Sequence, residues 1–266
     1  MSNEPTCYRH PDRVTYILCN RCGNNICTEC MVSAPVGFQC PDCVRDGRVQ
    51  VRTLHDFVPR VTYTIIGICV VLQVLPFVGI NTPNGFIYDF SLWPRAVAAG
   101  QTERVLTSIF LHGGWLHLGM NMYMLLVMGR QLEMALGRWR YLVLYLLAGL
   151  GGSATSYFFN GVDVPSVGAS GAIFGLFSAI FMFGRERGLN TQEIAAIVGL
   201  NLLIGFIVPG IDWHAHVGGL LTGAVVGWAL LPQRLRVLQW LVPIVAFGLI
   251  YAAIGVRTAE LSGLFY

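Results

Sequence analysis

The distribution of apolar residues divides the chain into a polar amino-terminal part and a long apolar part. Residues 1–60 contain no long apolar run, whereas seven apolar stretches follow Arg60. These stretches lie at 61–80, 108–129, 139–160, 168–184, 191–208, 213–231 and 237–256. Each approaches the roughly 20 residues that a helix needs to cross a bilayer, and none shows the period-two alternation of a membrane β-barrel strand. The pattern predicts an all-α polytopic membrane protein behind a small polar domain.

Charge composition narrows the classes of chemistry that the chain can carry. Only 12% of its 266 residues are charged, which is about half the usual share in a soluble domain. All 17 basic residues are arginine, so a Schiff-base lysine, a Ser–Lys dyad and a P-loop lysine are excluded. The net charge of +3 is too small to suggest a nucleic-acid partner.

Arginine placement predicts the orientation in the membrane. Arginines cluster before the first stretch and in alternate loops after it, at Arg45, Arg48, Arg52 and Arg60, at Arg130, Arg138 and Arg140, at Arg185 and Arg187, and at Arg234 and Arg236. The positive-inside rule then places the N-terminus in the cytosol and the C-terminus outside, in the plasma or inner membrane of the cell. No charged segment followed by a short apolar run opens the chain, so we expect no cleavable signal peptide.

Cysteine spacing in the polar part predicts metal binding. Four pairs with two-residue gaps follow one another, namely Cys7 and His10, Cys19 and Cys22, Cys27 and Cys30, and Cys40 and Cys43. A cytosolic compartment is reducing, so these side chains are expected to bind metal instead of forming disulfides. Eight such ligands make two tetrahedral zinc sites with no open position for catalysis. Because a segment this short has little core, the metal should supply its folding energy.

The pattern over roughly residues 5–45 resembles a B-box-type zinc finger. That resemblance implies a cross-brace, in which Cys7, His10, Cys27 and Cys30 hold one ion and Cys19, Cys22, Cys40 and Cys43 hold the other. The spacing alone equally allows sequential pairing. We interpret the domain as a docking module for a cytosolic protein partner, and the alternative is a metal-stapled cap that only anchors the N-terminus. Nucleic-acid binding is disfavoured because its arginines form no basic stripe.

Polar residues inside the apolar stretches are costly, so they indicate function. Ser170 opens a short stretch between Gly168 and Gly171, where a helix N-terminus offers unpaired N–H groups to a developing oxyanion. Gly171 and Gly175 line one face of that helix, and His216 shares a stripe with Gly219, Gly223 and Gly227 on another. Close packing of the two stripes would bring His216 within hydrogen-bonding reach of Ser170, as a base beside its nucleophile.

Two further polar residues share one helix face. His117 and Asn121 are four residues apart, and both can donate hydrogen bonds toward one point, as an oxyanion hole requires. Asp212 lies four residues before His216 and offers a third member of a triad as an alternative to a simple dyad.

The motifs together resemble those of the rhomboid intramembrane serine proteases. They are Gly168-Ala169-Ser170-Gly171, Ala215-His216-Val217-Gly218-Gly219, and the spacing of His112, His117 and Asn121, and the resemblance covers roughly residues 60–231. It implies that Ser170 is the nucleophile and His216 the general base, with His117, Asn121 and the Ser170 backbone N–H around the oxyanion. It also makes 81–107 a membrane-dipping first loop. The family often has Tyr where this chain has Phe174, and Phe keeps the aromatic ring that stacks on the base histidine. We expect His112 to be a structural hydrogen-bonder.

These observations predict four parts. Residues 1–48 form the zinc-binding domain, 49–60 a linker, 61–256 a rhomboid-like membrane domain and 257–266 a short tail; within the membrane domain, 61–231 is a six-helix core and 237–256 an added seventh helix. The predicted function is that of an intramembrane serine endopeptidase that acts on client transmembrane proteins within the lipid bilayer. It needs no cofactor for catalysis beside the two structural Zn²⁺ ions. The alternative is a catalytically silent rhomboid-like protein that binds membrane clients.

Overall fold

The computed structural model describes residues 4–34, 37–46, 57–79, 83–232 and 234–265. The chain forms two compact units, Met1–Asp56 and Phe57–Tyr266. The boundary between them falls inside the predicted linker 49–60, of which residues 49–56 lie outside the described part.

The amino-terminal unit has little regular structure and a core made mostly of sulfur. Strands β1 (Val32–Ser33) and β2 (Phe38–Gln39) pair antiparallel and precede helix α1 (Pro41–Asp46). The buried hydrophobic cluster consists of Ile26 and five cysteines, Cys7, Cys19, Cys27, Cys30 and Cys40. One buried aliphatic side chain contributes about 1.5–3 kcal/mol, which is far below the entropic cost of ordering some forty residues. This unit therefore needs stabilisation from outside its apolar core.

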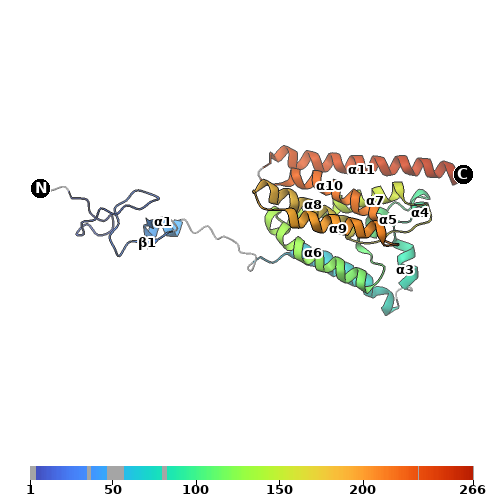
Figure 1. Ribbon diagram of the computed structural model, residues 1–266, viewed down its shortest axis with the longest axis horizontal. Helices are drawn as coiled ribbons and strands as arrows, with labels where there is room; N and C mark the ends of the chain where they lie inside the picture. Colours follow the sequence, from blue (N-terminus) through green and yellow to red (C-terminus); the bar gives the residue numbers. More distant parts are fainter. Residues whose placement is uncertain (1–3, 35–36, 47–56, 80–82, 233, 266) are drawn as a thin grey trace. The chain divides into compact units, whose positions relative to one another are not determined.

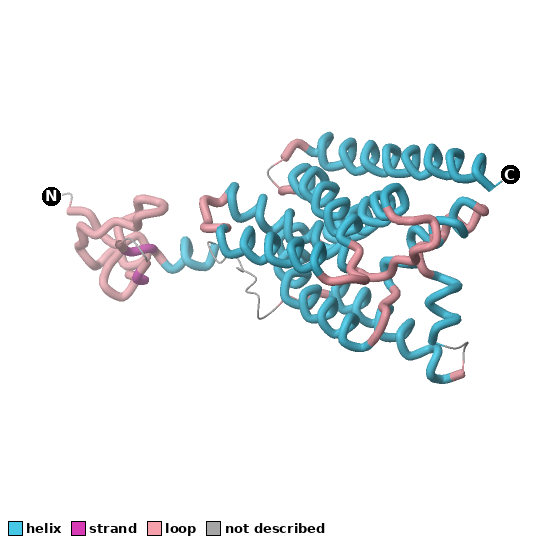
Figure 2. The backbone as a smooth tube through the Cα atoms, turned by 45° about the vertical axis from the view of Figure 1, so that its right-hand side comes forward, coloured by secondary structure: helices cyan, strands magenta, loops and turns pink. Residues whose placement is uncertain are grey.

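The second unit is built almost entirely from helices (Figures 1 and 2). Its first part contains α2 (Arg60–Val74), the 3₁₀ turn η1 (Leu75–Val78), α3 (Pro83–Phe90), α4 (Pro94–Ala98), α5 (Arg104–Thr107) and the 3₁₀ turn η2 (Ser108–Phe110). The longer helices follow as α6 (Trp115–Leu136), α7 (Arg138–Phe159), α8 (Ser170–Glu186), α9 (Gln192–Ile207), α10 (Trp213–Leu230) and α11 (Arg236–Phe265). Helices α7, α8 and α10 pack against one another, and α11 lies along the outside of α7 and α10 (Figure 1).

Among the described helices, three are long and apolar enough to span a membrane by length and composition. They are Arg60–Val78, Arg138–Phe159 and Arg236–Gly263, and Gln192–Ile207 is a shorter apolar helix. The structure thus gives a mostly helical membrane protein, and the count of seven crossings stays a prediction.

Two predicted boundaries differ from the structure. The second apolar stretch was expected at 108–129, but α6 runs from Trp115 to Leu136 and Ser108–Phe110 is a separate turn. Gly114 has a φ of +152°, which L side chains rarely adopt, so the helix begins only after it. His112 consequently lies in the loop before α6, not inside a membrane helix.

At the other end, α11 continues to Phe265, so the predicted tail 257–266 is helical over nearly its whole length. The Tyr157 hydroxyl of α7 lies 3.0 Å from the Thr258 hydroxyl, which anchors this extension to the bundle.

A buried carboxylate ties α6 to the start of α2. Glu133 is fully buried and accepts hydrogen bonds from the backbone N–H groups of Val61 (3.0 Å) and Thr62 (2.9 Å) and from the Thr62 hydroxyl (2.9 Å). It therefore caps the first turn of α2, whose N–H groups have no partner within their own helix. Sequence reasoning missed this role because the cap and the capped helix are about 70 residues apart.

The segment before α6 is held by one buried guanidinium. Arg104 donates to the Gln101 side-chain oxygen (2.6 Å) and to the carbonyl oxygens of Tyr88 (2.6 Å) and Ser91 (3.2 Å). These three bonds tie the start of α5 to the C-terminal end of α3 and to the loop between α4 and α5.

Candidate active site

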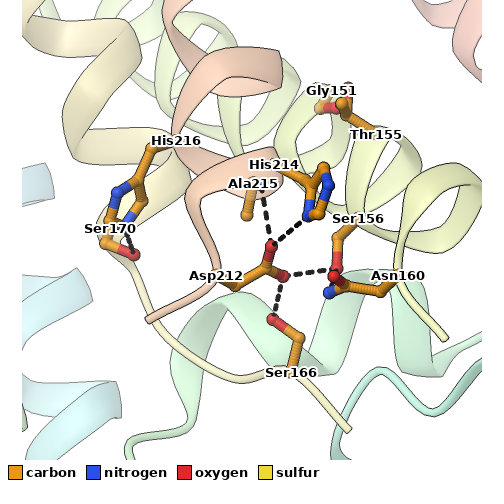
Figure 3. A network of polar contacts seen from close by, with 10 residues as sticks. All are labelled: Gly151, Thr155, Ser156, Asn160, Ser166, Ser170, Asp212, His214, Ala215 and His216. Atoms are coloured by element: carbon orange, nitrogen blue, oxygen red, sulfur yellow. Dashed lines mark hydrogen bonds and ion pairs between the residues drawn. The ribbon is translucent and has the colours of Figure 1, made fainter. Parts of the chain in front are cut away.

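Ser170 and His216 are hydrogen-bonded across the interface between α8 and α10. The Ser170 Oγ lies 2.9 Å from the His216 Nε2 (Figure 3). Ser170 is the first residue of α8, where backbone N–H groups lack partners in their own helix, and His216 lies in the first turn of α10 and is buried. A hydroxyl that donates to a neutral imidazole is the arrangement of a nucleophile with its general base.

Glycines allow the two helices to approach closely enough for this contact. A methyl group on Gly219 would overlap the Gly171 carbonyl oxygen, and one on Gly223 would overlap the Gly175 Cα. One turn further on, a methyl group on Gly227 would lie 2.8 Å from the Ala179 Cβ. The glycine stripes that were recognised in the sequence are therefore the contact surface that brings Ser170 and His216 together.

The imidazole of His216 is held by an aromatic ring. The rings of Phe174 and His216 stack with centroids 4.3 Å apart and planes inclined by 16°. Phe174 lies one turn after Ser170 on the same helix, so α8 supplies both the hydroxyl and the surface that orients its base. Stacking requires only the ring face, which Phe provides as well as Tyr.

His117 lies beside the backbone that precedes Ser170. A methyl group on Gly168, whose φ is +138°, would lie 3.0 Å from the His117 Nε2 and 3.5 Å from the Ser170 Oγ. The Gly113 backbone N–H donates to the His117 Nδ1 at 3.3 Å. Because Nδ1 accepts, the neutral ring carries its proton on Nε2, the nitrogen that faces Gly168 and Ser170. His117 can therefore donate a hydrogen bond to an oxyanion formed at Ser170.

Asn121 is buried one turn further along α6. Its side-chain amide donates to the His117 carbonyl oxygen at 2.9 Å, which fixes its orientation and leaves its second N–H available. The structure thus places His117 and Asn121 on one face of α6, and His117 next to the Ser170 backbone.

His112 packs against this group without hydrogen-bonding to it. Its ring is buried and meets the His117 ring edge-on, with centroids 5.1 Å apart. The structure therefore places His112 in a packing contact with His117, and its expected role as a structural hydrogen-bonder stays a prediction.

Asp212 does not complete a triad. Its carboxylate caps α10 by accepting from the Ala215 backbone N–H at 3.2 Å, and it points away from the His216 ring (Figure 3). The His216 Nδ1 has no hydrogen-bond partner among the described residues. Among the described residues, the geometry is therefore that of a serine and a histidine without a carboxylate partner on the imidazole.

The amino-terminal unit contains two four-residue clusters. One gathers Cys7, His10, Cys27 and Cys30, and the other gathers Cys19, Cys22, Cys40 and Cys43. Within each cluster all four candidate ligand atoms lie within 4.8 Å of one another. This grouping is the cross-brace, and the sequential pairing that the spacing also allowed is excluded.

The distances within these clusters fit a tetrahedral metal ion. The His10 Nδ1 lies 3.3 Å from the Cys27 Sγ and 3.4 Å from the Cys30 Sγ, and the Sγ atoms of Cys22 and Cys40 are 3.8 Å apart. A tetrahedral zinc ion requires N and S ligand atoms about 3.4–3.8 Å apart. Both clusters could hold a metal ion.

Backbone N–H groups favour the thiolate form of cysteines in both clusters, among them Cys7 and Cys19. Burial raises the pKa of the Cys7 thiol, but N–H groups of Arg9, Cys27 and His10 that point at the sulfur outweigh it and bring the pKa down to about 6. For Cys19, the same balance between burial and backbone N–H groups gives a pKa of about 6. Metal ligation requires the thiolate, so the surroundings of Cys7 and Cys19 suit metal binding.

The chain is similar to known proteins of one family. A family model described as a rhomboid domain matches residues 99–233, about half of the chain, which includes both Ser170 and His216. RHOMBOID-like protein 6, mitochondrial, of Arabidopsis thaliana is 36% identical over 148 residues, which are 53% of this chain and 48% of that protein. RHOMBOID-like protein 5 of the same plant is 39% identical over 145 residues, 52% of this chain and 47% of that protein. Rhomboid protease GluP of Bacillus subtilis is 36% identical over 197 residues, 69% of this chain and 37% of that protein. The matches span less than half the length of these relatives.

Proposed function

The chain belongs to the rhomboid family, and we propose that it is an intramembrane serine endopeptidase that cleaves transmembrane or membrane-adjacent segments of client membrane proteins. The observation that carries this proposal is the 2.9 Å contact between the Ser170 Oγ and the His216 Nε2. A catalytically silent protein has no need to keep both groups in hydrogen-bonding contact. The name of the relative GluP, a rhomboid protease, supports the same activity.

The dyad would act in two steps. In the first, the His216 Nε2 takes the Ser170 proton while Oγ attacks the peptide carbonyl, and the oxyanion receives hydrogen bonds from the Ser170 N–H, His117 Nε2 and Asn121. The imidazolium returns the proton to the leaving amine, which leaves an acyl-enzyme. In the second step a water molecule, deprotonated by His216, hydrolyses the ester and restores the dyad.

A covalent probe tests this function without a known client. A fluorophosphonate should react with the protein in native membranes, and mass spectrometry should find the adduct on Ser170. The Ser170→Ala variant is the control for adducts elsewhere. A wild-type protein that forms no adduct on Ser170 and does not cleave a panel of transmembrane substrates would instead be the silent, client-binding relative.

We propose the same membrane topology that the arginines indicate, with a cytosolic N-terminus and an extracytosolic C-terminus in the plasma or inner membrane. Helices α8 and α10 begin at the end of the bundle where Ser170 and His216 lie, and the C-terminal turn of α8 carries Arg185. The dyad would then open toward the extracytosolic side, where water can reach it.

For the amino-terminal unit we propose two structural zinc ions in the cross-braced clusters and a role in docking a cytosolic protein. Zinc, when bound, neutralises the clustered thiolates and links segments that the small apolar core cannot hold. Structural zinc supplies on the order of 10 kcal/mol to such domains, far more than the one buried isoleucine.

Zinc content and its removal test this assignment. Full-length protein should contain two zinc ions per chain, one for each cluster, and Cys22→Ala should lose one of them. Cys69→Ala is the matched control, because Cys69 lies in α2 outside both clusters. A strong chelator should make the bonds after Arg9, Arg13 and Arg21 sensitive to trypsin while the second unit stays folded. Continued protection of these bonds after complete metal removal would contradict a structural role.

A further inference from the structure

The Asp212 carboxylate accepts hydrogen bonds from residues of three separate segments. Its Oδ2 accepts from the hydroxyl of Ser156 on α7 and, at 2.6 Å, from the hydroxyl of Ser166 in the loop before α8 (Figure 3). Its Oδ1 accepts from the Ala215 N–H of its own helix at 3.2 Å and lies 3.6 Å from the His214 Nδ1. The carboxylate is mostly shielded from solvent, with 15% of its side chain exposed. N-capping alone needs only one of these contacts.

The direction of these bonds is determined. The Asn160 side-chain amide donates to the Ser156 Oγ at 3.0 Å, so the Ser156 proton is free to point at Asp212. An ionised carboxylate can only accept, and two hydroxyl donors and one backbone N–H surround it. Hydrogen bonds to a charged group are roughly twice as strong as those between neutral groups, so this junction is stiff.

Ser166 connects this junction to the nucleophile. Its backbone pairs with Leu92, with N–H to O distances of 3.0 and 2.9 Å, which ties it to the loop between α3 and α4. Two residues later the Gly168 N–H donates to the Ser108 carbonyl oxygen at 3.0 Å. The loop that leads into Ser170 is therefore fixed on one side by the first loop and on the other by Asp212.

The two helix starts are joined by two parallel contacts. Ser166 lies four residues before Ser170, and Asp212 lies four residues before His216. The same two segments are therefore joined twice. Ser166 is hydrogen-bonded to Asp212 at 2.6 Å, and four residues later in each segment Ser170 is hydrogen-bonded to His216 at 2.9 Å. If the loop before α8 shifted relative to α10, the hydrogen bond between Ser166 and the Asp212 carboxylate would have to break before Ser170 could move away from His216.

We propose that Asp212, through Ser166, is a positioning residue that sets the register between the nucleophile loop and the base helix. This inference rests on the proposed function, because it assigns Asp212 a part in the same serine chemistry. Asp212 acts without touching the imidazole: it holds the Ser170 backbone and the start of α10 in place, and it does not raise the basicity of His216 directly.

The test compares variants that separate the positioning of the loop before α8 from the N-capping of α10 by Asp212. Ser166→Ala removes the bond to the nucleophile loop but leaves the cap on Ala215, and Ser166→Thr restores the hydroxyl. Asp212→Ala removes both contacts. Ser178→Ala is the matched control, because that buried hydroxyl bonds to the Gly175 carbonyl oxygen of its own helix at 2.8 Å.

Saturation kinetics of fluorophosphonate labelling in full-length protein give the first readout. Loss of register should lower the maximal inactivation rate of Ser166→Ala and Asp212→Ala by about 10- to 100-fold and leave the half-saturating probe concentration within about twofold of wild type. Ser166→Thr and Ser178→Ala should label at nearly the wild-type rate. A Ser166→Ala rate equal to that of Ser178→Ala overturns the proposal, as does a loss that Ser166→Thr fails to restore.

Hydrogen exchange gives a second readout that does not depend on activity. Amides of residues 164–170 should exchange faster in Ser166→Ala and Asp212→Ala than in wild type, with no change in Ser178→Ala. If wild-type protein fails to label but this local change appears, the proposed function is wrong, and Asp212 orders the loop before α8 without a part in catalysis. Unchanged exchange in these amides overturns the positioning role whether or not the enzyme is active.

Discussion

Replacing His216 by Ala should reduce cleavage of a transmembrane substrate, and labelling of Ser170, by on the order of 10⁴- to 10⁶-fold. The His216 imidazole is hydrogen-bonded to the Ser170 hydroxyl, and among the described residues no carboxylate is hydrogen-bonded to the His216 Nδ1. The chain contains no lysine that could serve as an alternative base. A serine hydroxyl without a base is a weak nucleophile at neutral pH, so hardly any activity should survive.

The measurement should compare rates in reconstituted membranes at equal protein concentration. His55→Ala is the control, because it makes the same substitution in the polar part of the sequence that precedes the apolar stretches. Thermal unfolding of both variants shows whether the bundle is intact. If folded His216→Ala protein retained a tenth of the wild-type rate, the assignment of His216 as the general base would be wrong.

Replacing Gly223 by Leu should prevent the bundle from folding stably. Its new side chain would meet the Gly175 Cα and carbonyl, which are backbone atoms and cannot rotate away. Overpacking in a well-packed core usually costs about 1–3 kcal/mol where side chains can yield, so a clash with backbone should cost more. The helices would have to separate, and the separation would carry His216 away from Ser170.

Gly248→Leu provides the matched control for this prediction. Gly248 lies in α11, and a Cβ there would have no atom within 4 Å. Thermal unfolding in detergent should therefore show a large loss for Gly223→Leu and a change within about 0.5 kcal/mol for Gly248→Leu. Equal stability of the two variants would contradict the close contact between α8 and α10.

Much of the candidate site could be predicted because its signals are local. The glycines around Ser170, the stripe that follows His216 and the four-residue spacing of His117 and Asn121 each lie within two or three helical turns. Helical periodicity then places each set on one face without knowledge of the fold. The cysteine pairs are local in the same sense, since a two-residue gap brings both ligands to one ion.

Other features depend on contacts between distant segments, and sequence reasoning missed or misjudged them. Glu133 caps a helix that begins at Arg60, and Ser166 meets Asp212 across 46 residues. The second apolar stretch was placed too early because apolarity alone does not show that Gly114 interrupts the helix. Nothing in the local pattern of these residues indicates their partners.

By itself the sequence determined the kind of chemistry: an apolar bundle without lysine, a serine and a histidine on glycine-lined helix faces, and eight paired metal ligands. These features follow from residue type and spacing, because the backbone geometry of a helix or of a two-residue turn between ligands fixes where nearby side chains lie relative to one another. Only the tertiary structure decided which cysteine pairs gather into one cluster, and that the Asp212 carboxylate meets Ser166 and points away from the His216 ring. A carboxylate at a helix N-terminus, such as that of Asp212, can accept hydrogen bonds from several neighbouring groups. Which groups it binds depends on the donors that the folded chain places around it.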